Sequence, residues 1–128
     1  MDNQQSKEQL AEVGRLPFTE AVRTGNLLFI SGQIGIGQPG VGVDASFGVQ
    51  AVRVMENIGR VLESHGLQYG HLVNVTIYLT DMANYAETNK VYSRYFKDVF
   101  PARVCITVKE LPMGAAIEIS AVAFFNLI

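Results

Sequence analysis

The stretch LVNVTIYLT, residues 72–80, decides the class of fold that this chain can adopt. Apolar and polar side chains alternate along it, with Val73, Val75, Ile77 and Leu79 on one side, which is typical of a half-buried β-strand. The preceding residues 47–65 have a different period. Their apolar residues recur every three or four positions, as on the buried side of an amphipathic helix: Ala51, Met55, Ile58 and Leu62. A helix followed by such a strand indicates a fold that mixes α and β structure.

The N-terminal part of the chain shows the signals of a hairpin. Residues 20–23 and 27–30 are short strand candidates. Thr24-Gly25-Asn26 between them has the composition of a tight turn. Residues 32–42 are rich in glycine and are expected to form a loop before the first helix.

Further helix and strand signals follow residue 80. A second helix is expected to begin at Asn84, whose spacing to Glu87 resembles a capping box, and to run to about residue 96. Residues 102–109 and 116–125 are strand candidates. The loop of Leu111-Pro112-Met113-Gly114 between them predicts an antiparallel hairpin.

The resulting order β-β-α-β-α-β-β predicts an α+β fold with one mixed sheet. Because strand–helix–strand connections are right-handed, both helices are expected on the same face of that sheet. The other face would carry side chains that are too apolar to be left to water: Tyr78, Cys105, Thr107, Ser120, Val122 and Phe124. A second copy of the chain is the simplest cover, so the sequence predicts an oligomer.

Length and composition exclude several classes of protein. The 128 residues fit a single domain, in which residues 1–13 are expected to be a loosely held arm. The net charge of −2, without clusters of Lys and Arg, argues against a nucleic-acid partner. No apolar run is long enough to span a membrane, and the polar N-terminus does not resemble a signal peptide, so a cytoplasmic location is expected. One cysteine and two histidines predict no metal site.

Arg103 and Glu118 are the two charged residues that the pattern places inside apolar strands. Alternation groups Arg103 with Cys105, opposite Val104 and Ile106, and predicts that Arg103 faces away from the helices. Its guanidinium offers paired donors that suit a carboxylate. Glu118 is costly to bury unless it is paired or activates a water molecule. An ion pair between Arg103 and Glu118 across a subunit interface is the alternative, and from these residues alone the commoner case.

Other residues carry weaker signals. Ser31-Gly32 follows a strand end, where glycine allows a ligand to approach the backbone and N–H groups can hold an anion. Asn89 on the second helix is by default a solvated residue. Cys105 is by default a small buried side chain, and no neighbour in the sequence indicates a reactive thiol.

A series of short motifs runs in order from Pro17 to the last strand. They are Gly25-Asn26-Leu27, Ser31-Gly32-Gln33-Ile34, Gln50-Ala51, Glu56-Asn57-Ile58, Thr88-Asn89, Pro101-Ala102-Arg103-Val104-Cys105, Leu111-Pro112 and Ile117-Glu118-Ile119-Ser120-Ala121-Val122-Ala123. In this order and spacing the chain resembles the RidA/YjgF family. The resemblance implies a chorismate-mutase-like fold and a homotrimer with ligand clefts between subunits. It also implies hydrolysis of small carboxylated enamine or imine intermediates, such as 2-aminoacrylate, to 2-keto acids and ammonia, without a cofactor or metal.

The resemblance also implies roles for individual residues. Arg103 matches the arginine that binds the substrate carboxylate, and Glu118 matches the acidic residue associated with the hydrolytic water. The remaining positions line the cleft, Cys105 largely through its backbone: Ser31, Gly32, Asn89 and Cys105.

One position departs from the family pattern. Leu16-Pro17-Phe18 stands where the family usually has Gly-Pro-Tyr, so Phe18 keeps the ring of a substrate-contacting residue and lacks its hydroxyl. Two alternatives therefore stay open beside the simple deaminase. One is a specialised deaminase of a larger substrate, such as an aminomuconate-type intermediate. The other is a non-catalytic trimer that binds ligands or acts like a chaperone.

Overall fold

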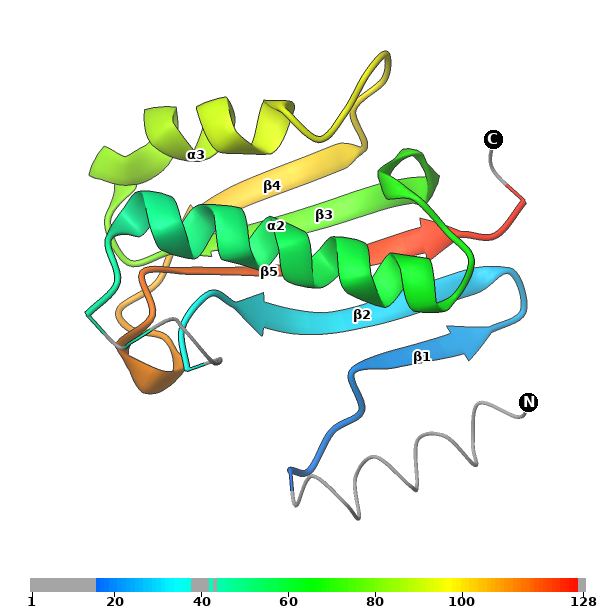
Figure 1. Ribbon diagram of the computed structural model, residues 1–128, viewed down its shortest axis with the longest axis horizontal. Helices are drawn as coiled ribbons and strands as arrows, with labels where there is room; N and C mark the ends of the chain where they lie inside the picture. Colours follow the sequence, from blue (N-terminus) through cyan, green and yellow to red (C-terminus); the bar gives the residue numbers. More distant parts are fainter. Residues whose placement is uncertain (1–15, 38–41, 43, 127–128) are drawn as a thin grey trace.

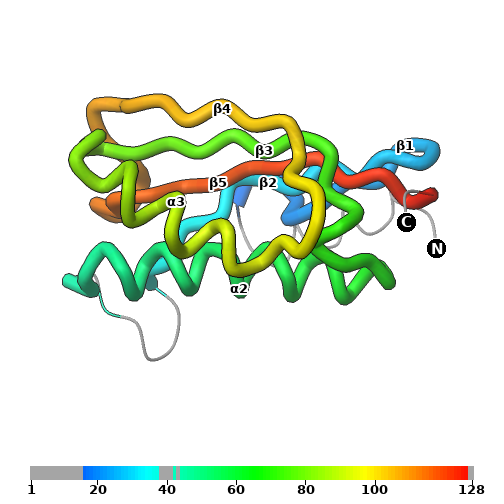
Figure 2. Tube along the Cα trace, turned by 90° about the horizontal axis from the view of Figure 1, so that it is seen from above, coloured from blue at the N-terminus to red at the C-terminus, as the bar shows by residue number. Residues whose placement is uncertain are grey.

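The computed structural model describes residues 16–37, 42 and 44–126. In this part the chain forms one five-stranded sheet with two helices on one face (Figure 1, Figure 2). The strands are β1 (Ala21–Thr24), β2 (Leu27–Ile34), β3 (Leu72–Leu79), β4 (Ala102–Thr107) and β5 (Ile117–Phe124). The helices are α2 (Phe47–Ser64) and α3 (Tyr85–Ser93), and the short 3-10 turns are η1 (Tyr69–His71), η2 (Met82–Asn84) and η3 (Pro112–Gly114). The expected arm, 1–13, and positions 38–41 and 43 of the expected loop lie outside the described residues.

The sheet has the strand order β1-β2-β5-β3-β4. Only β3 and β4 pair in parallel, and every other neighbouring pair is antiparallel. Helix α2 connects β2 to β3, helix α3 connects β3 to β4, and both lie below the same face of the sheet in Figure 2. The predicted mixed sheet with both helices on one face is confirmed. None of the described helices has the length and apolar character that a membrane crossing requires.

The predicted hairpin between the last two strands is wrong. Strand β5 lies between β2 and β3 and pairs with both of them, whereas β4 pairs with the far side of β3. The chain between residues 107 and 117 therefore passes the end of β3 rather than turning back on β4. The central position suits β5, because its alternate residues Ile117, Ile119, Ala121 and Ala123 are buried against the helices.

The core lies between α2 and the sheet. The apolar stripe of α2 is buried as predicted, with Ala51, Met55, Ile58 and Leu62 at most 2% exposed. The Ser46 hydroxyl accepts a hydrogen bond from the Val49 N–H at 3.4 Å and caps the helix N-terminus. Four residues predicted for the open face lie there, because their strand neighbours point into the core: Tyr78, Ser120, Val122 and Phe124.

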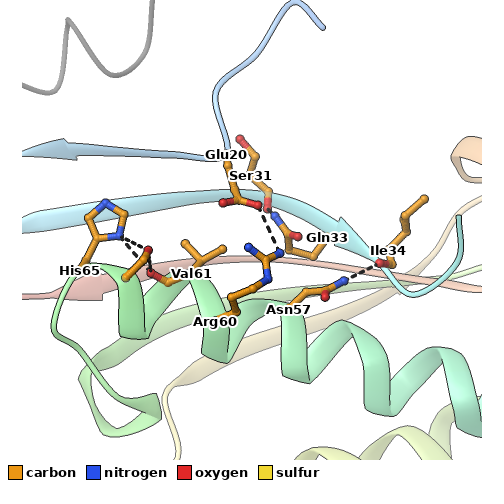
Figure 3. Close-up of polar contacts among 9 residues, drawn as sticks. Glu20, Ser31, Gln33, Ile34, Asn57, Arg60, Val61 and His65 are labelled. Carbon is orange, nitrogen blue, oxygen red and sulfur yellow. Dashed lines mark hydrogen bonds and ion pairs between the residues drawn. The ribbon is translucent and has the colours of Figure 1, made fainter. Parts of the chain in front are cut away.

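Two buried side-chain amides on α2, Gln50 and Asn57, form hydrogen bonds with backbone groups outside the helix. The Gln50 side chain donates to the Ala45 carbonyl and accepts from the Ala116 N–H, both at 2.9 Å. The Asn57 side chain donates to the Ile34 carbonyl at 3.0 Å, as Figure 3 shows. Because a buried amide is costly without hydrogen bonds, these contacts give the Gln50 and Asn57 motifs a structural role.

Strand β3 differs locally from its predicted alternation. Val73 is half-buried and Leu72 is buried, whereas Val75, Ile77 and Leu79 lie in the core as expected. A register shift between Leu72 and Asn74 moves the alternation by one residue at the strand's start.

Helix α3 is shorter than predicted. It ends at Ser93, three residues before the expected end. The Asn84 side chain makes no capping bond, so the capping box is wrong. Instead the Thr88 hydroxyl donates to the Asn84 carbonyl at 2.8 Å. The Asp81 carboxylate accepts from the Ala83 N–H and caps the preceding turn η2.

Candidate functional site

Arg103 lies on the face of the sheet that the helices cover, which corrects the prediction that it faces away from them. In the parallel ladder Arg103 is opposite Val75, and Cys105 is opposite Ile77. Both partners are core residues, at most 1% exposed. Since directly paired residues project from the same face of a sheet, Arg103 and Cys105 point toward the helices.

The error has a physical cause in the composition of β4. Its other face carries Val104 and Ile106, which look like core residues in the sequence but are 51% and 41% exposed. Strand β4 is at the sheet edge, and only the short helix α3 covers it (Figure 2). Hydrophobicity alone therefore could not tell its two faces apart.

A pocket of about 290 Å³ opens beside Arg103, between α3 and β4. Its lining combines one guanidinium and one carboxamide with aromatic rings: Asn89, Tyr92, Ser93, Phe100, Pro101 and Arg103. Two predicted site residues, Asn89 and Arg103, thus share one pocket although they are far apart in the sequence. A largely apolar cavity with a few converging polar groups is the usual form of a small-molecule site.

The Arg103 side chain is held by tyrosines. Its Nη2 donates to the Tyr85 hydroxyl at 3.3 Å. Its guanidinium carbon lies 5.7 Å from the centre of the Tyr85 ring and 5.1 Å from that of Tyr92. In the described part of the chain, the ion pairs are Arg53–Glu56 and Arg60–Glu20, and no carboxylate pairs with Arg103. Its charge is therefore not neutralised by any described carboxylate.

Tyr92 forms the inner side of this pocket. The residue is 4% exposed, and its hydroxyl has no hydrogen-bond partner among the described residues. Burial raises the pKa of Tyr92 to about 12, and the charge of Arg103 opposes that rise. The phenol is therefore neutral at physiological pH and keeps a proton that it can donate.

Sequence reasoning missed Tyr85 and Tyr92. A signal was present, because Tyr85, Asn89 and Tyr92 are spaced by four and three residues. On a helix this spacing places three side chains along one side. Once Asn89 was a candidate, both tyrosines could have been added.

Glu118 lies on the opposite, open face of the sheet. It is paired with Tyr78 in β3 and with Ile34 in β2. Its carboxylate lies over Gly32, where an added Cβ would collide with it. Burial raises the pKa of the Glu118 carboxyl above its ordinary value. A carboxylate of raised pKa beside open backbone suits proton transfer with water.

Ser31 and Gly32 form a bulge in β2, which continues to Ile34 instead of giving way to a loop at residue 32. The Ser31 hydroxyl donates to the Thr19 carbonyl at 2.6 Å, and the Ser31 N–H donates to the Glu20 carbonyl at 2.9 Å. The Gln33 side chain donates to the Ser31 carbonyl at 3.1 Å (Figure 3). The bulge thereby fastens the segment that carries Phe18, which is 51% exposed.

The predicted site residues thus form two groups. Arg103, Asn89 and Cys105 lie on the helix side, whereas Glu118 and Gly32 lie on the open face. A single chain does not bring the Arg103 and Glu118 side chains together. Burial raises the pKa of the Cys105 thiol, although Arg103 opposes it, which agrees with a packing role. In the described ranges 16–37, 42 and 44–126, no three His, Cys, Asp or Glu side chains gather as metal ligands.

Comparison with known proteins places the chain in a family. Residues 9–125 match the family model described as Endoribonuclease L-PSP. A RutC family protein of Aquifex aeolicus is 44% identical over 109 residues, covering 84% of this chain and 87% of the relative. Reactive Intermediate Deaminase A, chloroplastic, of Arabidopsis thaliana is 37% identical over 108 residues, covering 84% of this chain and 58% of the relative.

A solved structure gives the same result for the fold. The crystal structure of E. coli TdcF with bound serine superposes with a TM-score of 0.79 at 31% identity, covering 84% of this chain and 87% of TdcF. The motifs, the five-stranded sheet with two helices on one face, and these matches all agree. The chain belongs to the RidA/YjgF family.

Proposed function

We propose that this protein hydrolyses small carboxylated imine or enamine intermediates to 2-keto acids and ammonia, without a cofactor. The observation that carries the proposal is Arg103, a guanidinium in a pocket where no described carboxylate neutralises it. Family membership and the relative named Reactive Intermediate Deaminase A support the reaction class. TdcF, solved with bound serine, supports a ligand with a carboxylate.

Hydrolysis of an iminium ion requires few catalytic groups. An iminium carbon is already electrophilic, so the pocket mainly has to orient the ion and supply water. Arg103 binds the substrate carboxylate through paired N–H donors. Water adds to the carbon of the C=N bond, and Glu118 accepts its proton. Glu118 returns this proton to the nitrogen of the resulting carbinolamine and takes up its hydroxyl proton as the C–N bond breaks. Ammonia leaves, the last proton passes to it to give ammonium, and a 2-keto acid remains.

This reaction needs more than one copy of the chain. Because Arg103 and Glu118 project from opposite faces of the sheet, the Glu118 that serves a given Arg103 has to come from a neighbouring subunit. The open face has apolar side chains to bury in such a contact, since Phe29, Val104 and Ile106 are all more than 40% exposed. A closed homotrimer with three clefts between subunits would bring Arg103 to the Glu118 of a neighbour and would bury the apolar open face. Its interfaces would be of the head-to-tail type.

Phe18 favours a narrower version of the proposal, a deaminase for a larger substrate. The exposed ring offers apolar contact and no hydroxyl. A purified dehydratase that releases imines from serine, from threonine and from bulkier amino acids would rank the substrates. A higher kcat/KM for the bulkier imines supports the larger pocket, and equal or lower values reject it.

The same coupled assay tests the main proposal. Wild-type protein is expected to accelerate imine decay over buffer, and Arg103→Ala is expected to abolish most of this acceleration. Arg103→Lys is expected to be poor too, because lysine keeps the charge and loses the paired donors. Arg53→Ala is the matched control, since Arg53 pairs with Glu56 on α2 away from the pocket. No acceleration by wild type, or equal rates for Arg103→Ala, would reject deaminase activity at this site.

A further inference from the structure

Tyr85 is hydrogen-bonded to the pocket residue Arg103, and no motif assigns it a role. It is the first residue of α3, its side chain is 42% exposed, and its hydroxyl accepts a hydrogen bond from Arg103 Nη2 at 3.3 Å. A phenol that accepts through a lone pair still has its own proton to donate. Because the hydroxyl proton can rotate, it is free to point toward an anion that Arg103 binds.

We propose that Tyr85 is a second carboxylate-binding residue, which donates its hydroxyl proton to the carboxylate that Arg103 binds. The inference rests on the proposed function and names the group that completes its anion site. Both carboxylate oxygens accept from the paired donors of the Arg103 guanidinium, and one of them also accepts from the Tyr85 hydroxyl. A carboxylate has lone pairs enough for both.

Tyr85 also prepares Arg103 before the ligand arrives. A free arginine side chain has many rotamers, and ordering it on binding weakens affinity. Here the hydrogen bond to Tyr85 and the nearby rings of Tyr85 and Tyr92 restrict the rotamers of the Arg103 guanidinium. Tyr85 thus contributes to carboxylate affinity in two ways: its hydroxyl donates a hydrogen bond, and it holds the Arg103 guanidinium in position.

The arrangement predicts selectivity for carboxylates over uncharged analogues. Arg103 and Tyr85 lie within hydrogen-bond distance of each other and both have donors to offer, and no described carboxylate pairs with the guanidinium. An amide in place of the carboxylate brings N–H groups against these donors and leaves one of them without an acceptor. Loss of the Tyr85 hydroxyl is expected to weaken this selectivity and to leave the bond-making step unchanged.

The test is a titration that does not depend on turnover. Calorimetry with 2-oxobutanoate, a 2-keto acid product, is run on wild type, Tyr85→Phe and the control Tyr95→Phe, with 2-oxobutanamide as the uncharged comparison. Tyr95 also carries a phenol but packs on Tyr69, with ring centres 5.1 Å apart, whereas the Arg103 guanidinium donates to the Tyr85 hydroxyl. Tyr85→Phe is expected to weaken 2-oxobutanoate binding about tenfold, as for a hydrogen bond to a charged group.

Kinetics add a readout that a structural role would not change. In the imine assay, Tyr85→Phe is expected to raise KM by about the same factor and to change kcat less than about twofold. The melting temperature is expected to stay at the wild-type value, because the hydroxyl is at the surface. Unchanged Kd and KM in Tyr85→Phe overturn the inference, as does an equal loss in Tyr95→Phe.

The two measurements separate this inference from the proposed function. If wild type binds 2-oxobutanoate, Tyr85→Phe binds it more weakly, and imines are not hydrolysed, the function fails and the carboxylate site stands. If imines are hydrolysed and Tyr85→Phe behaves as wild type, the function stands and Tyr85 has no role. Absence of 2-oxobutanoate binding by wild type overturns the role of Tyr85 as well.

Discussion

The pocket around Arg103 and the group around Glu118 are built in different ways. The first is formed within one chain, where α3 packs on β4 and brings Asn89, Tyr92 and Arg103 around one cavity. The second lies on the open face, where Glu118 rests over the β2 bulge at Gly32 and no described helix covers it. Ligand binding is therefore expected to be a property of the single chain, and turnover a property of the assembly.

The largest effect is expected from Glu118→Gln. The amide has nearly the same shape and cannot accept a proton, so kcat should fall by about a hundredfold or more. Binding of 2-oxobutanoate should stay near the wild-type value, because the Arg103 pocket is unchanged. The coupled assay and calorimetry measure the two quantities. A comparable loss of binding would show that Glu118 is needed for the carboxylate site.

A charge on the open face is expected to separate the subunits. Phe29→Glu places a carboxylate among the apolar side chains of this face, whereas Val49→Glu does so at a comparably exposed position on α2. Sedimentation should show a trimer for wild type and Val49→Glu, and smaller species for Phe29→Glu. Turnover should fall at least tenfold in Phe29→Glu while 2-oxobutanoate binding is largely kept. An active monomer would contradict the contrast between the two regions.

A methyl group at the bulge is expected to disturb Glu118 alone. In Gly32→Ala the new Cβ would collide with the Glu118 carboxylate, whereas in the control Gly70→Ala it meets nothing within 4 Å. Gly32→Ala should lower kcat about tenfold through the displaced carboxylate, with a small effect on KM. Steady-state kinetics of both variants measure this. Equal kinetics for wild type and Gly32→Ala would show that the placement of Glu118 is not critical.

The smallest effect concerns pH. Glu118 has to be ionised to accept a proton, and burial raises its pKa above the ordinary value. Activity should be present above that raised pKa and lost as the pH falls through it, so kcat/KM declines at a higher pH than for an exposed glutamate. The residual activity of Glu118→Gln should lack this decline. An unchanged decline in Glu118→Gln would assign it to another group.

The parts of the fold with strong local signals were predictable from the sequence. Helix α2 runs from Phe47 to Ser64 as expected, because its apolar period persists over five turns and Ser46 caps it. The hairpin of β1 and β2 was also predicted, because Thr24-Gly25-Asn26 has the composition of a tight turn. In the structure Gly25 takes the left-handed conformation that favours glycine, with φ +59°.

Long-range order was not predictable in the same way. No local sequence signal predicts that β5 lies between β2 and β3. The same loop residues can precede either a hairpin strand or a strand that crosses to another place in the sheet. Placing the faces of β4 needed the register with β3, which pairs Arg103 with Val75. The candidate site residues were named from motifs in the sequence, and their division between two faces of the sheet appeared only with the strand register.

The most direct test of the shared site is complementation between two inactive variants. Arg103→Ala keeps Glu118, and Glu118→Gln keeps Arg103, so a mixed form of the proposed trimer would contain some clefts with both groups intact. If each cleft draws these residues from neighbouring subunits, an equal mixture that is refolded together should recover about one quarter of wild-type activity, by random assembly of head-to-tail interfaces. If both residues act within one chain, the mixture should stay as inactive as the separate variants.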